Sequence, residues 1–295
     1  RFSDFSVLYR DERPGEIHGL LRSRAFTQDD GHCFCREDQI GEEFSRVLMV
    51  VDEAMKAYGF EYWIRLSLRD PKNQEKYLGD NAVWERAESK LRKIVSEKNL
   101  PYREGLGEAA IYGPKLDFMM KDSLGREWQL STIQLDMIMP ARFELTYADS
   151  DGTEKTPFMI HRAIIGSERF IAILIEHFAG KFPLWLSPVQ VKIIPIADRH
   201  HEKARQAAKI LIEKGIRVKI DNRAESMQAK VRDATLQKIP YLGIIGDKEA
   251  DPANVCLAVR NRSGAQVGVL EVREFAVTLE KEIENKVYEK TESAQ

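Results

Sequence analysis

The sequence predicts an α/β protein of two domains, the first an antiparallel sheet with flanking helices and the second a mixed sheet. Apolar residues recur at three- and four-residue steps from Asp38 to Tyr58 and from Trp84 to Val95, which predicts two amphipathic helices, with Asp38 available as a cap. Residues 116–130 alternate around a turn at 123–125, which predicts an antiparallel hairpin. From Val189 to Ile245 strand-like and helix-like segments alternate, which indicates a βαβ layout with a mostly parallel core.

A short connector separates the two patterns. It contains two prolines and ends just before Val189. We therefore place a domain boundary near Ser187 and expect domains at residues 1–187 and 188–295, since 295 residues are enough for about two domains of ordinary size. A final amphipathic helix is predicted from about Val272 to Lys286.

Charge and cysteine content limit the class of protein. Lys and Arg number 45 against 47 Asp and Glu, so a polyanionic partner must be held by local basic patches. The odd count of three cysteines does not suggest a disulfide framework, which favours a reducing, cytoplasmic compartment. No apolar run approaches the roughly 20 residues that cross a bilayer, so no membrane partner is expected.

The densest group of chemically useful side chains lies in RSRAFTQDDGHCFC, residues 22–35, with YRDE at 9–12 before it. Strand alternation places three of these side chains on one face, namely Asp30, His32 and Phe34. Cys33 and Cys35 then point the other way and are interpreted as small core residues. On composition alone, a solvated hairpin with charged sides is an open alternative.

This stretch resembles motif 2 of the class II aminoacyl-tRNA synthetases in its threonyl form. Two further stretches look like substrate-binding strands of that family, GEAAIYGPKLDF at 107–118 and STIQLDMIMPARFELTY at 131–147. MIHRAIIGSERF at 159–170 resembles motif 3, and residues 221–249 resemble an anticodon-binding domain. Four catalytic-domain motifs in family order make the resemblance specific, and it spans essentially the whole chain.

The resemblance implies that the protein forms threonyl-adenylate from threonine and ATP and then transfers threonine to tRNA(Thr). Arginine suits such a site because its guanidinium is always charged and can fork onto phosphate oxygens. The residues matched to ATP contacts are Arg10 (α-phosphate), Glu12 (adenine amino group), Arg22 (outer phosphates), Phe26 and Arg169 (faces of adenine) and Gln134 (near the α-phosphate). Mg²⁺ would accompany the ATP. Taken alone, Arg10 is also compatible with a surface ion pair.

Two more matched residues lie in the substrate-binding strands. Tyr112 and Lys115 correspond to a tyrosine and a lysine beside the substrate. The resemblance therefore gives an expected catalytic set of Arg10, Lys115, Gln134 and Arg169. For Lys115, a solvated lysine at a strand edge is an open alternative.

Choosing threonine over valine is difficult for an apolar pocket because the two are isosteres. A zinc ion with open positions solves this, since it can take the amino and hydroxyl groups of threonine together. The resemblance implies Zn²⁺ ligands at His32 and His161, and threonine contacts from Gln28 and Asp30. The third family ligand, a cysteine, is expected upstream of Arg1.

The chain departs from the family pattern in motif 3, where Ser167 runs directly into Glu168 and one apolar residue is lacking. One residue fewer at a helix start turns Arg169 by about 100°, which should spoil adenine stacking unless the strand-to-helix junction re-forms. A harmful deletion and a residue missing from the sequence are both open explanations. Motif 1, which builds the family's homodimer interface, and the editing region are also absent.

In the second domain, Lys and Arg outnumber Asp and Glu between Lys192 and Arg262, which indicates a modest basic face. Arg232, Glu249 and Arg260 match anticodon-contacting positions, and such side chains can read unstacked bases. A solvated helix or strand face is the open alternative for the two arginines.

Two other functions are compatible with these residues. A catalytically impaired fragment or paralogue would act as an RNA-binding module through its second domain. A sister synthetase for proline or serine would have no need of His32 and His161 together with Asp30.

Overall fold

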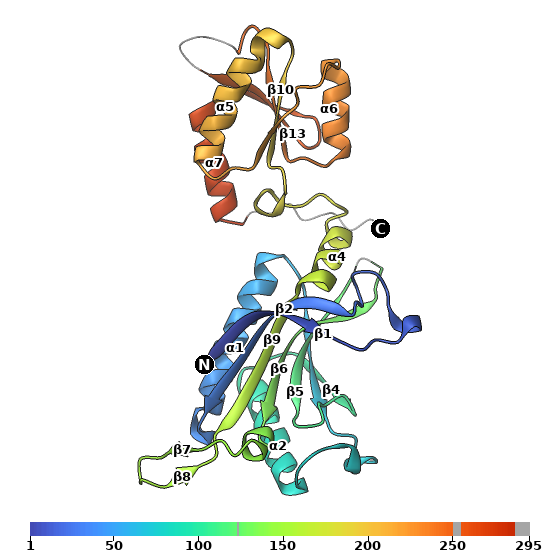
Figure 1. The fold of residues 1–295 in the computed structure, drawn as a ribbon, viewed down its shortest axis with the longest axis vertical. Coiled ribbons are helices and arrows are strands. Elements are labelled where there is room, and N and C mark those ends of the chain that lie inside the picture. The colour runs from blue at the N-terminus through green and yellow to red at the C-terminus, as the bar shows by residue number, and fades with distance from the viewer. Residues whose placement is uncertain (123, 250–254, 287–295) are drawn as a thin grey trace. The chain divides into compact units, whose positions relative to one another are not determined.

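The computed structural model describes residues 1–122, 124–249 and 255–286 (Figure 1). The chain divides into two compact units, Arg1–Ile173 and Leu174–Gln295. Ser123, in the predicted hairpin turn, lies outside the described residues. None of the helices in the described part is both long and apolar enough to span a membrane.

A seven-stranded sheet forms the first unit, in the order β1-β2-β9-β6-β5-β3-β4 (Figure 1). In that order the strands are Phe2–Tyr9, Ala25–Cys35, Phe158–Gly166, Glu127–Asp136, Lys115–Lys121, Trp63–Leu68 and Tyr102–Leu106. All neighbours run antiparallel except the parallel pair β3 and β4, which confirms the predicted antiparallel sheet. A small hairpin joins β7 (Tyr147–Ala148) to β8 (Glu154–Lys155).

Two long amphipathic helices, α1 (Ile40–Ala57) and α2 (Asn81–Glu97), pack on this sheet and confirm the predicted pair. The expectation that Asp38 caps the first helix is wrong. Asp38 lies in a 3-10 turn before α1, and its carboxylate accepts hydrogen bonds from Arg36 at 3.1 and 2.9 Å instead. Among the described residues before β10, the other helices are α3 (Met139–Arg142), α4 (Ser167–His177) and the 3-10 helices Pro14–Glu16, Glu37–Gln39, Gln74–Lys76 and Leu184–Leu186.

The loop before β5 packs so closely on the sheet that Gly113 has no room for a side chain. A Cβ there would lie 2.0 Å from the carbonyl oxygen of Leu135 in β6. We expect Gly113→Ala to lower the free energy of unfolding by about 3 kcal/mol, because a backbone oxygen in a sheet cannot move aside. Denaturant unfolding measures this. Gly41→Ala is the control, since a Cβ at Gly41 meets nothing within 4 Å, and equal stability of the two variants would contradict the expectation.

The second unit holds a five-stranded mixed sheet in the order β11-β10-β12-β13-β14. The strands are Val218–Ile220, Val191–Pro195, Tyr241–Ile245, Cys256–Asn261 and Gln266–Glu271. β10 pairs in parallel with both β11 and β12, and the other pairs are antiparallel, which confirms the predicted mixed sheet with a parallel core.

Three α-helices cover the two faces of this sheet (Figure 1). Buried residues of α5 (His201–Glu213) and α7 (Val272–Glu284) share one core cluster with the strands. α6 (Met227–Leu236) contributes to a separate cluster on the other face. A 3-10 helix, Asp198–His200, precedes α5.

Two arginines of the second unit hydrogen-bond to the connector before β10. Arg262 donates to the carbonyl oxygens of Lys181 and Phe182, and Arg217 donates to those of Trp185 and Ser187 at 2.8 and 2.9 Å. The boundary we propose at Ser187 lies at the end of this connector.

Candidate active site

The register of the first sheet brings together residues that are far apart in sequence. His32 in β2 lies opposite His161 in β9, His161 lies opposite Gln134 in β6, and Gln134 lies opposite Lys115 in β5. Directly opposed residues in antiparallel strands place their side chains on the same face. These four predicted site residues therefore form one row across the sheet.

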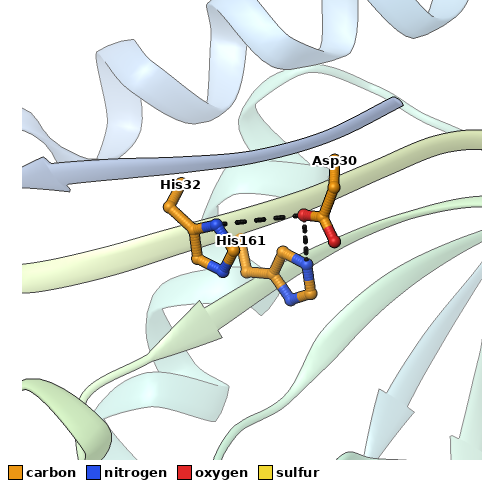
Figure 2. Close-up of side chains that lie close together, drawn as sticks. All are labelled: Asp30, His32 and His161. Carbon is orange, nitrogen blue, oxygen red and sulfur yellow. Dashed lines mark hydrogen bonds and ion pairs between the residues drawn. The ribbon is translucent and has the colours of Figure 1, made fainter. Parts of the chain in front are cut away.

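At one end of this row, Asp30, His32 and His161 form a compact cluster (Figure 2). The Asp30 carboxylate oxygen Oδ1 lies 2.8 Å from His161 Nε2 and 3.9 Å from His32 Nδ1. The two imidazole rings stack with centroids 4.5 Å apart and planes within 4°. Nitrogen and oxygen donors of the three residues all lie within 4.8 Å of one another.

The donor set of this cluster fits a zinc ion, which binds imidazole nitrogen and carboxylate oxygen at about 2.0–2.2 Å. Burial and the neighbouring His161 lower the pKa of His32, which favours the neutral imidazole that a metal requires. The resemblance assigned Asp30 to threonine, whereas here its carboxylate contacts His161. Asp30 is therefore placed either to join the ligands or to orient His161.

The two cysteines beside His32 lie on the opposite face, as alternation predicts. Cys33 and Cys35 are buried, and the Cys33 thiol donates to the Glu43 carboxylate of α1 at 3.3 Å. Burial raises the pKa of Cys33, and raises that of Cys35 to about 12. A metal ligand must be a thiolate, so these positions do not substitute for a zinc cysteine.

Asp30 gives the cluster a pH dependence. Burial would raise the pKa of its carboxyl, but the hydrogen bond with His161 and the charges of both imidazoles outweigh it and leave the pKa below the ordinary 3.8. Ionised Asp30 therefore stabilises the fold above that ordinary value, and this stabilisation is lost as pH falls through the folded pKa. We expect metal-free Asp30→Asn to be less stable than wild type above pH 3.8, and the difference in unfolding free energy to shrink as pH falls below that value. Urea unfolding across this range measures the difference, and a gap that does not narrow in acid would contradict the assignment.

A cavity of about 330 Å³ extends from the cluster along the same face. The predicted site residues that line it are Arg10, Glu12, Arg22, Phe26, Gln28, Asp30, Tyr112, Gln134, His161 and Arg169. Two of the site residues predicted in the first unit do not: His32 lies beside His161, and the Lys115 ammonium donates to Asp117 at 2.6 Å. The positions matched to ATP and those matched to threonine thus share one cavity.

Four of the residues matched to ATP contact one another in this structure. The Arg10 guanidinium lies over the Phe26 ring, 5.2 Å from its centroid. Arg22 donates to the Glu12 carboxylate at 3.0 Å, so the residues matched to the outer phosphates and to adenine pair with each other. Because the Arg22 side chain is 47% exposed, this pair is weak and open to exchange with a ligand.

The shortened motif 3 still delivers Arg169 to the cavity. At the end of β9 the pairing register shifts between Gln28 and Asp29, and Ile165 adopts a φ of 51°, which a β-branched residue rarely does. Strand β9 therefore carries a bulge at Ile165 just before α4. Arg169 lines the cavity wall, where its guanidinium donates to the carbonyl oxygens of Leu21 at 2.9 Å and Gln129 at 3.3 Å.

The three residues matched to anticodon contacts come from separate elements of the second unit. Arg232 lies on α6, Glu249 follows β12, and Arg260 is in β13. The Glu249 carboxylate accepts a hydrogen bond from the backbone of Gly246 at 2.9 Å. Within the described residues, neither arginine forms an ion pair.

Comparison with known proteins agrees with this arrangement. The family described as "tRNA synthetase class II core domain (G, H, P, S and T)" matches residues 1–178, and "Anticodon binding domain" matches residues 190–282. The solved RNA binding domain of threonyl-tRNA synthetase from Cryptosporidium parvum Iowa II is 34% identical, with a TM-score of 0.86 over 95% of this chain and 69% of that one. The chain belongs to the threonyl-tRNA synthetase family of class II.

Curated relatives in this threonyl-tRNA synthetase family are longer than the chain. A threonine–tRNA ligase of Thermotoga neapolitana is 48% identical over 292 residues, which is 99% of this chain and 45% of the relative. One from Rubrobacter xylanophilus is 50% identical over 268 residues, 90% of this chain and 42% of the relative. The chain thus spans a little under half the length of these relatives.

Sequence reasoning missed several residues of the synthetase cavity. Leu21, Gln129, Ser131 and Thr132 also line it. Asp117, buried beneath Lys115, carried a usable signal, because an acidic residue within the apolar strand sequence KLDFMM must find buried partners.

Proposed function

We propose that the protein ligates threonine to tRNA(Thr) through a threonyl-adenylate, with Zn²⁺ holding threonine and Mg²⁺ accompanying ATP. The observation that carries this proposal is the meeting of His32, His161 and Asp30 at one end of an arginine-lined cavity. Such a cavity can hold a β-hydroxy amino acid next to a nucleotide.

The arginines account for the first half-reaction. When the threonine carboxylate attacks the α-phosphorus of ATP, pyrophosphate leaves and negative charge builds up on the phosphate oxygens. Arg10 and Arg169 line the same cavity and can stabilise that charge with forked N–H donors. Phe26 supplies an apolar face for adenine. The Tyr112 hydroxyl donates a hydrogen bond to the Gln134 side chain, which holds that amide in place near the reacting phosphate.

Threonine selection is assigned to the metal cluster. His32 and His161 would hold the ion, and Asp30 and Gln28, which line the cavity, would accept hydrogen bonds from the amino group of threonine. A bound zinc ion would take the amino and hydroxyl groups together, a pair that valine does not possess. Discrimination then depends on both histidines.

The second unit is assigned to the anticodon of tRNA(Thr). Arg232 and Arg260 supply charge and forked donors, and Glu249 supplies an acceptor for base edges. As in the family, the protein is proposed to work in the cytoplasm as a homodimer.

The test is threonine-dependent ATP–pyrophosphate exchange by the full-length protein, measured together with its zinc content. We expect exchange with threonine, roughly 10,000-fold less with valine, and one zinc per chain. Exchange supported by proline, or by serine without any requirement for His32 and His161, would assign the chain to a sister synthetase.

A second candidate function rests on the second unit alone. Its described residues form a five-stranded sheet with two core clusters, and residues 190–282 match an anticodon binding domain. A catalytically impaired RNA-binding form would bind tRNA and show no exchange. The same assay, combined with a tRNA binding measurement, separates the two functions.

A further inference from the structure

A fully buried carboxylate lies beside the proposed site without touching the cavity. Asp117 in β5 is 0% exposed, and both of its oxygens are engaged. Oδ2 accepts from Lys115 Nζ at 2.6 Å, from Ser67 Oγ at 2.8 Å and from Arg65 at 3.1 Å. Oδ1 accepts from Thr132 Oγ1 at 2.9 Å.

The sheet register explains this convergence. Arg65, Asp117 and Thr132 are directly opposed across β3, β5 and β6. The next row on the same face contains Ser67 and Lys115, and it continues through Gln134 to His161. Asp117 is therefore one row away from the residues assigned to substrate, and its Thr132 partner forms part of the cavity wall.

A lysine needs an anchor of this kind if its ammonium is to act at a fixed point. Its stem carries roughly 2 kcal/mol of rotamer entropy, so an unanchored ammonium samples many positions. The Lys115 side chain is only 13% exposed, and Asp117 is its sole ion-pair partner within the described residues. Arg65, by contrast, also pairs with Glu108 at 3.3 Å. Two carboxylates thus balance the two cations, and of these Asp117 alone holds the Lys115 ammonium.

We infer that Asp117 is a positioning residue that fixes the Lys115 ammonium for threonine activation. The inference rests on the proposed function and adds a residue to it. Asp117 acts through Lys115, so its removal should matter only while Lys115 is present. A purely structural carboxylate would instead affect the site whether or not Lys115 is there.

The test is a double-mutant cycle in the full-length protein, with Asp117→Asn, Lys115→Met and the double variant, assayed by threonine-dependent ATP–pyrophosphate exchange. We expect Asp117→Asn to lower kcat about 10- to 100-fold, as the loss of a supporting partner commonly does. The double variant should be no slower than Lys115→Met alone. If Asp117→Asn does not fold, Asp117→Glu enters the same cycle, because any displacement of the carboxylate must lose its effect when Lys115 is absent.

Asp221→Asn is the matched control. Asp221 is a buried carboxylate of the second unit that also holds a lysine and an arginine, Lys192 at 3.4 Å and Arg223 at 2.7 Å. We expect this variant to lose stability and keep exchange activity. Effects of Asp117 and Lys115 that multiply, or an Asp117→Asn enzyme with wild-type kcat, would overturn the inference. Wild-type protein without threonine-dependent exchange would instead overturn the proposed function.

Discussion

His161→Ala is expected to abolish zinc binding and to lower threonine-dependent ATP–pyrophosphate exchange by more than about 100-fold. Even mutation of a residue that only hydrogen-bonds to a metal ligand lowers metal affinity or activity roughly 10- to 100-fold. His161 contacts both other residues of the cluster. Its ring stacks on that of His32 and shares a hydrogen bond with the Asp30 carboxylate, and it lines the cavity. Its loss leaves a single imidazole in the cluster and so breaks the set of two histidines and one cysteine expected to hold the zinc. Zinc content by atomic emission and exchange kinetics at saturating ATP measure the two effects.

The matched control for this variant is His201→Ala. His201 begins α5 in the second unit, and its ring pairs with Asp198 at 3.7 Å. Removing that imidazole should change neither zinc content nor exchange. Retention of zinc and threonine selectivity by His161→Ala would contradict the metal assignment.

Arg10→Lys is expected to lower kcat for exchange by about 100- to 1,000-fold, with a much smaller change in KM for threonine. Lysine keeps the positive charge but lacks the planar fork that can hold two phosphate oxygens. It also gives up the guanidinium's position over Phe26, 5.2 Å from the ring centroid. The rise in the barrier should therefore fall on the chemical step, which pre-steady-state adenylate formation measures.

Arg24→Lys provides the comparison for Arg10→Lys. Arg24 belongs to the same loop, but its Nε donates to the Glu12 carbonyl at 3.1 Å and its side chain does not line the cavity. We expect nearly wild-type kcat. Equal losses in the two variants would mean that the loop as a whole, and not the Arg10 fork, supports the reaction.

The local parts of this structure could be predicted from sequence because they depend on short-range periodicity. Alternation in β2 correctly separated Asp30 and His32 from the two cysteines, and helical steps located α1 and α2. The capping role of Asp38 failed because Arg36, two residues away, competes for its carboxylate.

Long-range features could not be derived from local pattern alone. The register that sets His32 opposite His161 depends on how distant strands pair, and it was expected only through the resemblance to known synthetases. The lack of one residue in the stretch matched to motif 3 was expected to rotate Arg169 unless the strand-to-helix junction re-formed. Arg169 lines the cavity, and the bulge at Ile165 before α4 was not predicted, because it depends on how β9 pairs with β2. The Arg22–Glu12 pair was likewise not predicted, because it forms between two residues that had been matched to a ligand.

The central claim is that His32 and His161 coordinate one metal ion, which in turn binds threonine. Anomalous diffraction at the zinc edge, from crystals of the full-length protein with threonine bound, tests it most directly. We predict one strong peak about 2.0–2.2 Å from a nitrogen of each ring, with the threonine amino and hydroxyl groups at the remaining positions. A zinc peak elsewhere, or threonine bound with no metal between the two rings, would contradict the account.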